Sequence, residues 1–155
     1  MNSINKFLLS IIVTVVSSMG HAEIMLNDVN GQNTPFTALK GKWVLINYWA
    51  GWCQTCVDEI PEFNRFNERH KNKGIALFGV NYDALPVFEQ KSLIKRLNIT
   101  YSSLAIDPGS ELRLGDIAGV PVTFIFNPQG QLVETLYGGQ TADNLDRIIN
   151  KLKAA

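Results

Sequence analysis

Two cysteines, Cys53 and Cys56, are the side chains of this sequence best suited to covalent chemistry, and the chain has no others. Two residues separate them, a spacing that lets their sulfurs close into a small, reversible disulfide ring. The pair follows an apolar, β-prone run at 43–49 and precedes a stretch with helical periodicity. We therefore predict thiol-disulfide chemistry at a strand-to-helix junction.

The expected position of Cys53 at the start of a helix indicates how the pair would work. Unpaired backbone N–H groups and the helix dipole stabilise an anion at that point, so a thiolate at Cys53 is favoured. Cys56 lies one turn further into the helix, where it can attack a mixed disulfide formed at Cys53. We expect Cys53 to be the nucleophile and Cys56 to be the resolving thiol.

Other readings of the same residues are weaker. A static disulfide, or two idle buried cysteines, would also satisfy the spacing. A structural zinc site needs four ligands, and beyond position 22 the chain offers only the two cysteines and His70 among its cysteines and histidines. We interpret His70 as an exposed residue near the end of the helix, where the helix dipole favours it. We therefore expect neither a metal nor a cofactor.

Length and composition limit what can surround this site. The chain has 155 residues, 46% of them hydrophobic, which is enough for one compact domain with a core. Its 14 basic and 14 acidic residues balance. This balance argues against nucleic acid or an anionic membrane surface as a partner. We expect one domain with one active site.

The first 22 residues have the pattern of an export signal. Lys6 precedes the apolar stretch Phe7–Val16, which is too short to cross a membrane comfortably. Small residues at Gly20 and Ala22 favour cleavage after Ala22, leaving 23–155 as the domain; an uncleaved membrane anchor is the alternative. Two cysteines are too few for the disulfide-stapled scaffolds of exported proteins, so the pair is better explained as chemistry.

Hydrophobic periodicity predicts alternating strands and helices around the pair. Turn residues within 24–36 favour short strands or a hairpin before the core. We expect strands at 43–49, 75–80, 103–106, 122–126 and 132–137, and helices at 53–73, 88–97 and 141–153. This order predicts an α/β fold: a mixed central sheet with helices on both faces and an N-terminal β extension.

Three motifs carry a resemblance to the thioredoxin superfamily. They are the run from Asn47 to Cys56, the sequence Glu59-Ile60-Pro61, and the run from Gly119 to Thr123. Within the superfamily, the chain resembles the exported TlpA/ResA/DsbE-like group of bacterial thiol-disulfide proteins over roughly residues 24–153. The resemblance implies a thioredoxin fold and a periplasmic location.

The resemblance also implies roles for residues outside the cysteine pair. Pro121 matches the family's cis-proline beside the cysteines, and Val120 matches a residue whose backbone pairs with an extended substrate strand. Pro61 matches a proline that kinks the first helix, and we give it a structural role. Trp52 flanks Cys53, so we expect it to shield the thiol and to offer an apolar contact to partners.

Glu59 is the expected proton-handling group. It lies three residues after Cys56, on nearly the same helical face, and matches an acidic residue that the resembled group keeps near its cysteines. We hypothesise that it tunes the thiols and relays a proton to or from Cys56; a surface charge without a role is the alternative. Asn47 stands where thioredoxin has a buried Asp, and because an amide cannot titrate, the acid–base burden shifts to Glu59.

The leading functional prediction is an enzyme, a thiol-disulfide oxidoreductase that acts on exported proteins through a mixed disulfide at Cys53. The resemblance favours a reductant, for example in cytochrome c maturation, recharged by a membrane-bound redox partner, and we expect the protein to be a monomer. An oxidant that introduces disulfides is the first alternative. A Cu(I)-binding metallochaperone is weaker, because soft thiolates suit Cu(I) but copper-delivery relatives tend to have a wider cysteine spacing and a distal His. An isomerase ranks low, because no dimerisation segment is visible.

Overall fold

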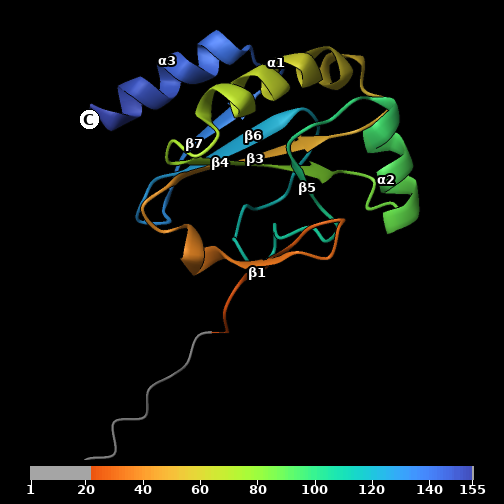
Figure 1. Cartoon of the computed structure of the whole chain (residues 1–155), viewed down its shortest axis with the longest axis horizontal. Helices are drawn as coiled ribbons and strands as arrows, with labels where there is room; N and C mark the ends of the chain where they lie inside the picture. The colour runs from red at the N-terminus through yellow and green to blue at the C-terminus, as the bar shows by residue number, and fades with distance from the viewer. Residues whose placement is uncertain (1–21, 155) are drawn as a thin grey trace, which may run out of the picture.

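A five-stranded mixed sheet with strand order β5-β4-β3-β6-β7 forms the centre of the protein (Figure 1). The structure is a computed structural model that describes residues 22–154; the predicted export signal, apart from Ala22, lies outside them. The strands are β3 (Trp43–Trp49), β4 (Ile75–Asn81), β5 (Ser102–Leu104), β6 (Val122–Phe126) and β7 (Leu132–Tyr137). β3 pairs in parallel with β4 and antiparallel with β6, so the strand that leads to the cysteines lies in the middle.

The five strand predictions are confirmed, with differences at the ends of β4 and β5: β4 runs one residue further than predicted, to Asn81, and β5 begins one residue earlier, at Ser102. β5 ends at Leu104, two residues before the predicted end at Ile106. The Ile106 side chain is exposed, and the backbone N–H of Ala105 donates instead to Asn27 O at 2.8 Å. The N-terminal segment therefore takes over the hydrogen bonding where the strand was expected to continue.

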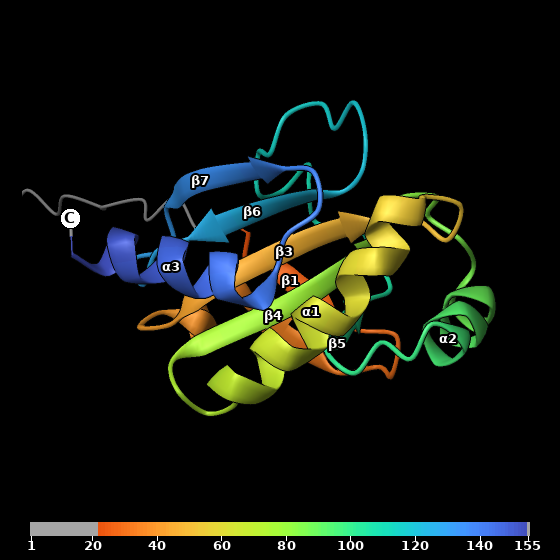
Figure 2. The same ribbon diagram turned by 90° about the horizontal axis from the view of Figure 1, so that it is seen from above.

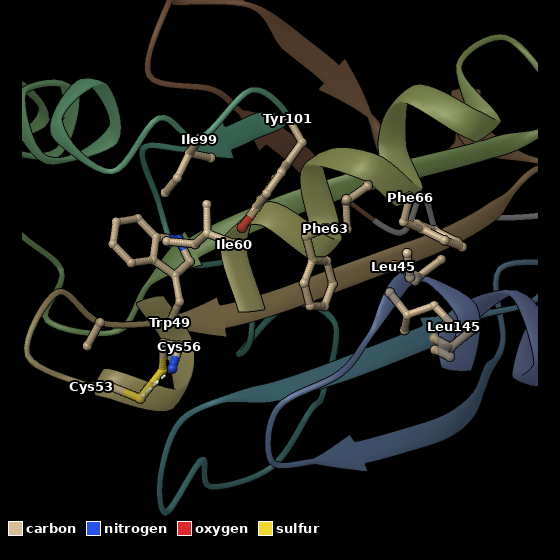
Figure 3. Close-up of a cluster of buried hydrophobic side chains, with 14 of the residues drawn as sticks. Leu45, Trp49, Cys53, Cys56, Ile60, Phe63, Phe66, Ile99, Tyr101 and Leu145 are labelled. Carbon is tan, nitrogen blue, oxygen red and sulfur yellow. Dashed lines mark hydrogen bonds between the residues drawn. A yellow bond between two sulfur atoms is a disulfide. The ribbon is translucent and has the colours of Figure 1, made fainter. Parts of the chain in front are cut away.

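Two helices, α1 (Gln54–His70) and α3 (Ala142–Lys153), lie side by side over one face of the sheet (Figure 2). Buried apolar side chains of α1 and α3, such as Phe63 and Leu145, pack in one cluster with Leu45 of β3 (Figure 3). Helix α2 (Val87–Arg96) lies at the side of the sheet, and its Leu93 joins the same cluster. Each large apolar side chain buried there contributes about 1.5–3 kcal/mol to stability.

In the described part of the chain, the opposite face of the sheet is not covered by the α-helices that the sequence predicts there. The predicted N-terminal hairpin is present as β1 (Met25–Asn27) paired antiparallel with β2 (Asn33–Pro35), and it is followed by a short 3₁₀ helix, η1 (Phe36–Leu39). Within residues 22–154, the apolar cluster on this face takes its members from the sheet, the hairpin, η1 and the connection after β5. The mixed sheet flanked by helices is confirmed, but the expectation of α-helices on both faces is wrong, because the hairpin, η1 and this connection cover the second face.

Strand β3 explains how the sequence positions the site. All seven of its residues are buried, as expected for a strand covered on both faces. Leu45 and Trp49 face the cluster under α1, while Val44 and Ile46 face the opposite cluster. By this alternation Asn47 also points toward α1. The strand thus presents one polar side chain to the helix that carries the cysteines.

Helix α3 begins as the sequence predicts, with the Thr141 side chain accepting a hydrogen bond from Asn144 N at 3.2 Å. The first turns of α3 contact the end of α1, where Arg69 donates to Asp146 at 2.8 Å. His70 contacts the same carboxylate and packs against the ring of Phe66. His70 is therefore half-buried rather than exposed, because α3 covers it.

No helix within the described range is both long enough and apolar enough to cross a membrane.

Candidate active site

Cys53 and Cys56 form a disulfide where β3 passes into α1 (Figure 3). Their Cα atoms lie 5.2 Å apart. Cys53 keeps 8% of its surface exposed, whereas Cys56 is fully buried at 0%. A partner from solvent can therefore reach the sulfur of Cys53 more readily than that of Cys56.

Cys53 is the N-cap residue of α1. Its backbone is extended, and its Sγ accepts a hydrogen bond from the backbone N–H of Cys56 at 3.2 Å. This N–H group and the positive end of the helix dipole both stabilise negative charge on the Cys53 sulfur. Cys53 therefore lies at the start of a helix, as predicted from the sequence, with a backbone donor at its sulfur.

The loop that precedes β6 lies beside the disulfide. The Val120–Pro121 peptide bond is cis, as the sequence resemblance implies, and Val120 O lies 3.7 Å from Cys53 Sγ. The same loop lines a cleft of about 420 Å³, whose other walls include Ile117 and Tyr137. Main-chain groups next to Cys53 thus border a space that an extended peptide could enter.

Trp52 lies on the open side of the site, with 68% of its surface exposed. Its indole Nε1 donates to the Asp83 carboxylate, at 3.0 and 3.1 Å from the two oxygens. This bond ties the polar edge of the ring to the loop after β4 and leaves much of its apolar surface in solvent. Shielding of Cys53 and contact with a partner both stay predictions.

Glu59 is buried, with only 4% of its surface exposed, so the alternative of an idle surface charge is wrong. Asn47 Nδ2 donates to its Oε1 at 2.9 Å, and the backbone N–H of Gln140 donates to its Oε2 at 3.0 Å. Burial raises the pKa of Glu59 to about 7, and these two hydrogen bonds work against a larger rise. The carboxyl group can therefore take up or release a proton near neutral pH.

Two of the groups that hold this network were missed by sequence reasoning. Asn47 Nδ2 also donates to Thr123 Oγ1 at 3.2 Å, because β3 and β6 pair with these two residues opposite each other. Gln140 reaches Glu59 through its main chain, which leaves no signature in the side-chain pattern. Thr123 ends the motif that begins at Gly119, and a correct β3–β6 register would have placed it beside Asn47.

Gly139 brings the loop between β7 and α3 against the first turn of α1. A Cβ atom at this position would lie 2.9 Å from Thr55 Cγ2 and 3.9 Å from Glu59 Oε2. The first distance is too short for a real side chain, so glycine permits the close approach. This approach allows the Gln140 N–H group to reach Glu59.

Comparisons with known proteins agree with this site. The sequence model of the AhpC/TSA family matches residues 21–135. The chain belongs to the AhpC/TSA family. It is 28% identical over 130 residues to the thiol-disulfide oxidoreductase ResA of Bacillus cereus, covering 83% of this chain and 73% of ResA. It is 32% identical over 128 residues to the thiol:disulfide interchange protein HelX of Rhodobacter capsulatus, covering 80% of this chain and 70% of HelX.

Solved structures support the fold of this AhpC/TSA family member. A thioredoxin-family thiol:disulfide interchange protein from Chlorobium tepidum superposes with a TM-score of 0.71 at 24% identity, covering 83% of this chain and 92% of that one. StoA from Bacillus subtilis gives a TM-score of 0.68 at 23% identity, covering 81% and 95%. The predicted thioredoxin fold is confirmed. Together with the family and the cysteine pair, the named relatives confirm the enzyme class, thiol-disulfide oxidoreductase.

Among residues 22–154, no group of three or more His, Cys, Asp and Glu side chains is arranged to hold a metal ion.

Proposed function

We propose that this protein is a reductant of disulfides in exported proteins. Cys53 is the nucleophile, Cys56 is the resolving thiol and Glu59 is the acid–base group. The sequence resemblance supports the reductant direction. The observation that carries the assignment of the two thiols is the contrast between Cys53, which keeps 8% of its surface exposed, and the fully buried Cys56, which lies one helical turn before a buried carboxyl group. This arrangement separates the sulfur that meets the substrate from the sulfur that needs a proton acceptor inside the protein.

The first step forms a mixed disulfide. The Cys53 thiolate of the reduced protein attacks one sulfur of a substrate disulfide, and the substrate S–S bond breaks as the new one forms. The other substrate sulfur leaves as a thiolate and takes a proton from solvent. The Cys56 N–H group and the helix dipole favour the attacking thiolate before this step.

The second step releases the substrate. The Cys56 thiol gives its proton to the Glu59 carboxylate and attacks Cys53 Sγ, which expels the second substrate sulfur as a thiolate. The protein ends as the Cys53–Cys56 disulfide, and two electrons have passed to the substrate. A dithiol donor that runs the same exchange in reverse then returns two electrons, and Glu59 returns the proton to Cys56.

Substrate capture falls to the loop beside the disulfide. We propose that the main chain of Val120 pairs with an extended substrate segment, while Pro121 packs beside the cysteines and Trp52 supplies an apolar contact. The cleft of about 420 Å³ next to Val120 and the exposed ring of Trp52 support this assignment. Because main-chain pairing depends little on side chains, a range of protein substrates would fit.

The compartment and the partners follow from the sequence pattern and the resemblance. The export-signal pattern at 1–22, with 23–155 as the mature domain, supports a periplasmic location. We propose a membrane-bound redox partner that recharges the cysteine pair, and apocytochrome c as one substrate in cytochrome c maturation. Introduction of disulfides by the same cysteines is the alternative direction.

The proposal is tested by trapping the mixed disulfide. Reduced Cys56→Ser protein, mixed with a disulfide-bonded peptide, should accumulate a covalent adduct at Cys53, because the resolving step is blocked. The matched Cys53→Ser protein should form little adduct, since Cys56 is buried. Mass spectrometry of the two variants decides the roles, and equal adduct formation in both would contradict them.

A further inference from the structure

Asn47 lies in the middle of the central strand and contacts the buried carboxyl group of Glu59. In register it stands opposite Gly79 of β4 and Thr123 of β6, and none of its surface is exposed. Its Nδ2 atom donates to Glu59 Oε1 at 2.9 Å and to Thr123 Oγ1 at 3.2 Å. Both amide hydrogens are therefore used, one toward α1 and one across the sheet.

The other end of the same amide is unsatisfied. Asn47 Oδ1 is buried and has no hydrogen-bond partner within the part of the chain that the structure describes. A buried acceptor without a partner carries a free-energy cost, which an apolar side chain of similar size would avoid. The other six residues of β3 are all apolar or aromatic. Packing alone therefore does not account for an amide at this position, whereas donation to Glu59 does.

We propose that Asn47 is a positioning residue of the exchange reaction, which holds Oε1 of Glu59 in place and favours the carboxylate over the carboxylic acid. The inference rests on the proposed acid–base role of Glu59. An amide N–H group only donates, and a donor in buried surroundings stabilises a charged acceptor. Because the Asn47 amide does not titrate, it remains a donor to the Glu59 carboxylate at every pH at which the protein is folded.

The ionisable groups near Glu59 offer no substitute for this donor. Cys56 lies one helical turn before it, and Glu62 follows on the same helix and accepts from a backbone N–H at the start of α3. Burial raises the pKa of Tyr101, and the charge of Glu59 raises it further. No basic side chain among residues 22–154 forms an ion pair with Glu59. The two N–H donors therefore provide the stabilisation of charge that an ion pair would otherwise provide.

The matched pair of variants is Asn47→Leu and Thr123→Val. Asn47→Leu removes the donor to Glu59 and keeps the number of side-chain heavy atoms, whereas Thr123→Val removes the other partner of Asn47 and leaves that donor intact. NMR titration of the Glu59 carboxyl carbon in oxidised protein should show about tenfold tighter proton binding in Asn47→Leu. In Thr123→Val the proton affinity should stay within about twofold of the wild type.

The pH profile of disulfide exchange separates this inference from the proposed function. If both hold, the acid limb of the profile in Asn47→Leu moves to higher pH together with the titration of Glu59. A moved titration with an unmoved profile would support Asn47 as the group that positions Glu59 and would contradict the acid–base role of Glu59. An unchanged titration of Glu59 in folded Asn47→Leu protein would overturn the inference.

A measurement on the wild-type protein covers the case in which Asn47→Leu does not fold. The Nδ2 proton of Asn47 that points at Oε1 should move downfield as Glu59 loses its proton, with the same midpoint as the Glu59 carboxyl carbon. An Asn47 amide resonance that stays constant through the titration of Glu59 would overturn the inference without any substitution.

Discussion

Trp52 and Val120 form an open rim around the active-site sulfur, whereas Glu59, Asn47 and Gln140 form a buried polar set behind it. The rim residues lie in connections at the ends of strands, and the Trp52 ring is mostly in solvent. The buried set joins a strand, a helix and a loop through N–H donors at 2.9 and 3.0 Å from one carboxyl group. Changes in the rim should therefore alter substrate capture, and changes in the buried set should alter proton transfer and stability.

The largest expected effect in the buried set is on the rate of exchange. Glu59→Gln keeps the size of the side chain but removes its ability to accept a proton from Cys56, so exchange at neutral pH should slow by about 100-fold. The rate is measured as turnover of a disulfide-bonded peptide with a dithiol donor. Asp58→Asn, which removes an exposed carboxyl group from the same turn, is the control. Equal rates for Glu59→Gln and the control would contradict the acid–base role.

The buried set should also make stability depend on pH. The pKa of Glu59 rises from its ordinary 4.5 to about 7 in the folded state. Between these values the folded protein keeps a proton that the unfolded chain has lost, so stability falls as pH rises through this window, by up to about 3 kcal/mol. Urea unfolding of the wild type and Glu59→Gln at several pH values isolates the effect. The same dependence of stability on pH in both proteins would contradict the assignment of this effect to Glu59.

Gly139→Ala tests whether the loop before α3 must lie close to the helix. The added Cβ would lie 2.9 Å from Thr55 Cγ2, so the Thr55 side chain or the loop must move, and a shift of the loop would weaken the Gln140 bond to Glu59. We expect a loss of about 1–3 kcal/mol in urea unfolding. Gly119→Ala, where a Cβ meets nothing within 4 Å, should change stability by less than about 0.5 kcal/mol. Equal losses would show that the loop is not held by this contact.

The smallest effect on stability is expected in the rim. Trp52→Ala should leave the free energy of unfolding within about 0.5 kcal/mol, because most of the ring is exposed and its bond to Asp83 lies at the surface. It should raise KM for a protein disulfide several-fold and leave exchange with glutathione disulfide nearly unchanged, because a small substrate does not span the rim. A similar loss with both substrates would instead place Trp52 in the chemistry at Cys53.

Local sequence patterns were sufficient to predict the helices and strands and to single out the cysteine pair. β3 could be predicted because a strand buried on both faces needs a continuous apolar run, and the cap at Thr141 could be predicted from its residue type. The cysteines could be assigned because their spacing and their place before a helix both have a direct chemical meaning. The half-burial of His70 could not, because it depends on how α3 crosses α1.

Contacts between distant segments set the limit of prediction. The Asn47–Thr123 contact depends on a strand register between residues 76 positions apart, and the Gln140–Glu59 bond uses a main-chain group. The prediction also failed for the second face of the sheet, where α-helices were expected, because this face too depends on contacts between distant segments. The hairpin before η1 is mostly polar in sequence, and Leu26 and hydrogen bonds to β5 and its end attach it to this face.

The most direct test of the central claim is the equilibrium reduction potential of the Cys53–Cys56 pair in the mature domain, measured by equilibration with a dithiothreitol or glutathione buffer series. A protein that reduces exported disulfides should have a potential near that of thioredoxin, about −270 mV. A potential near about −120 mV, the value of a strong oxidant, would contradict the proposed role as a reductant and would show that the protein introduces disulfides.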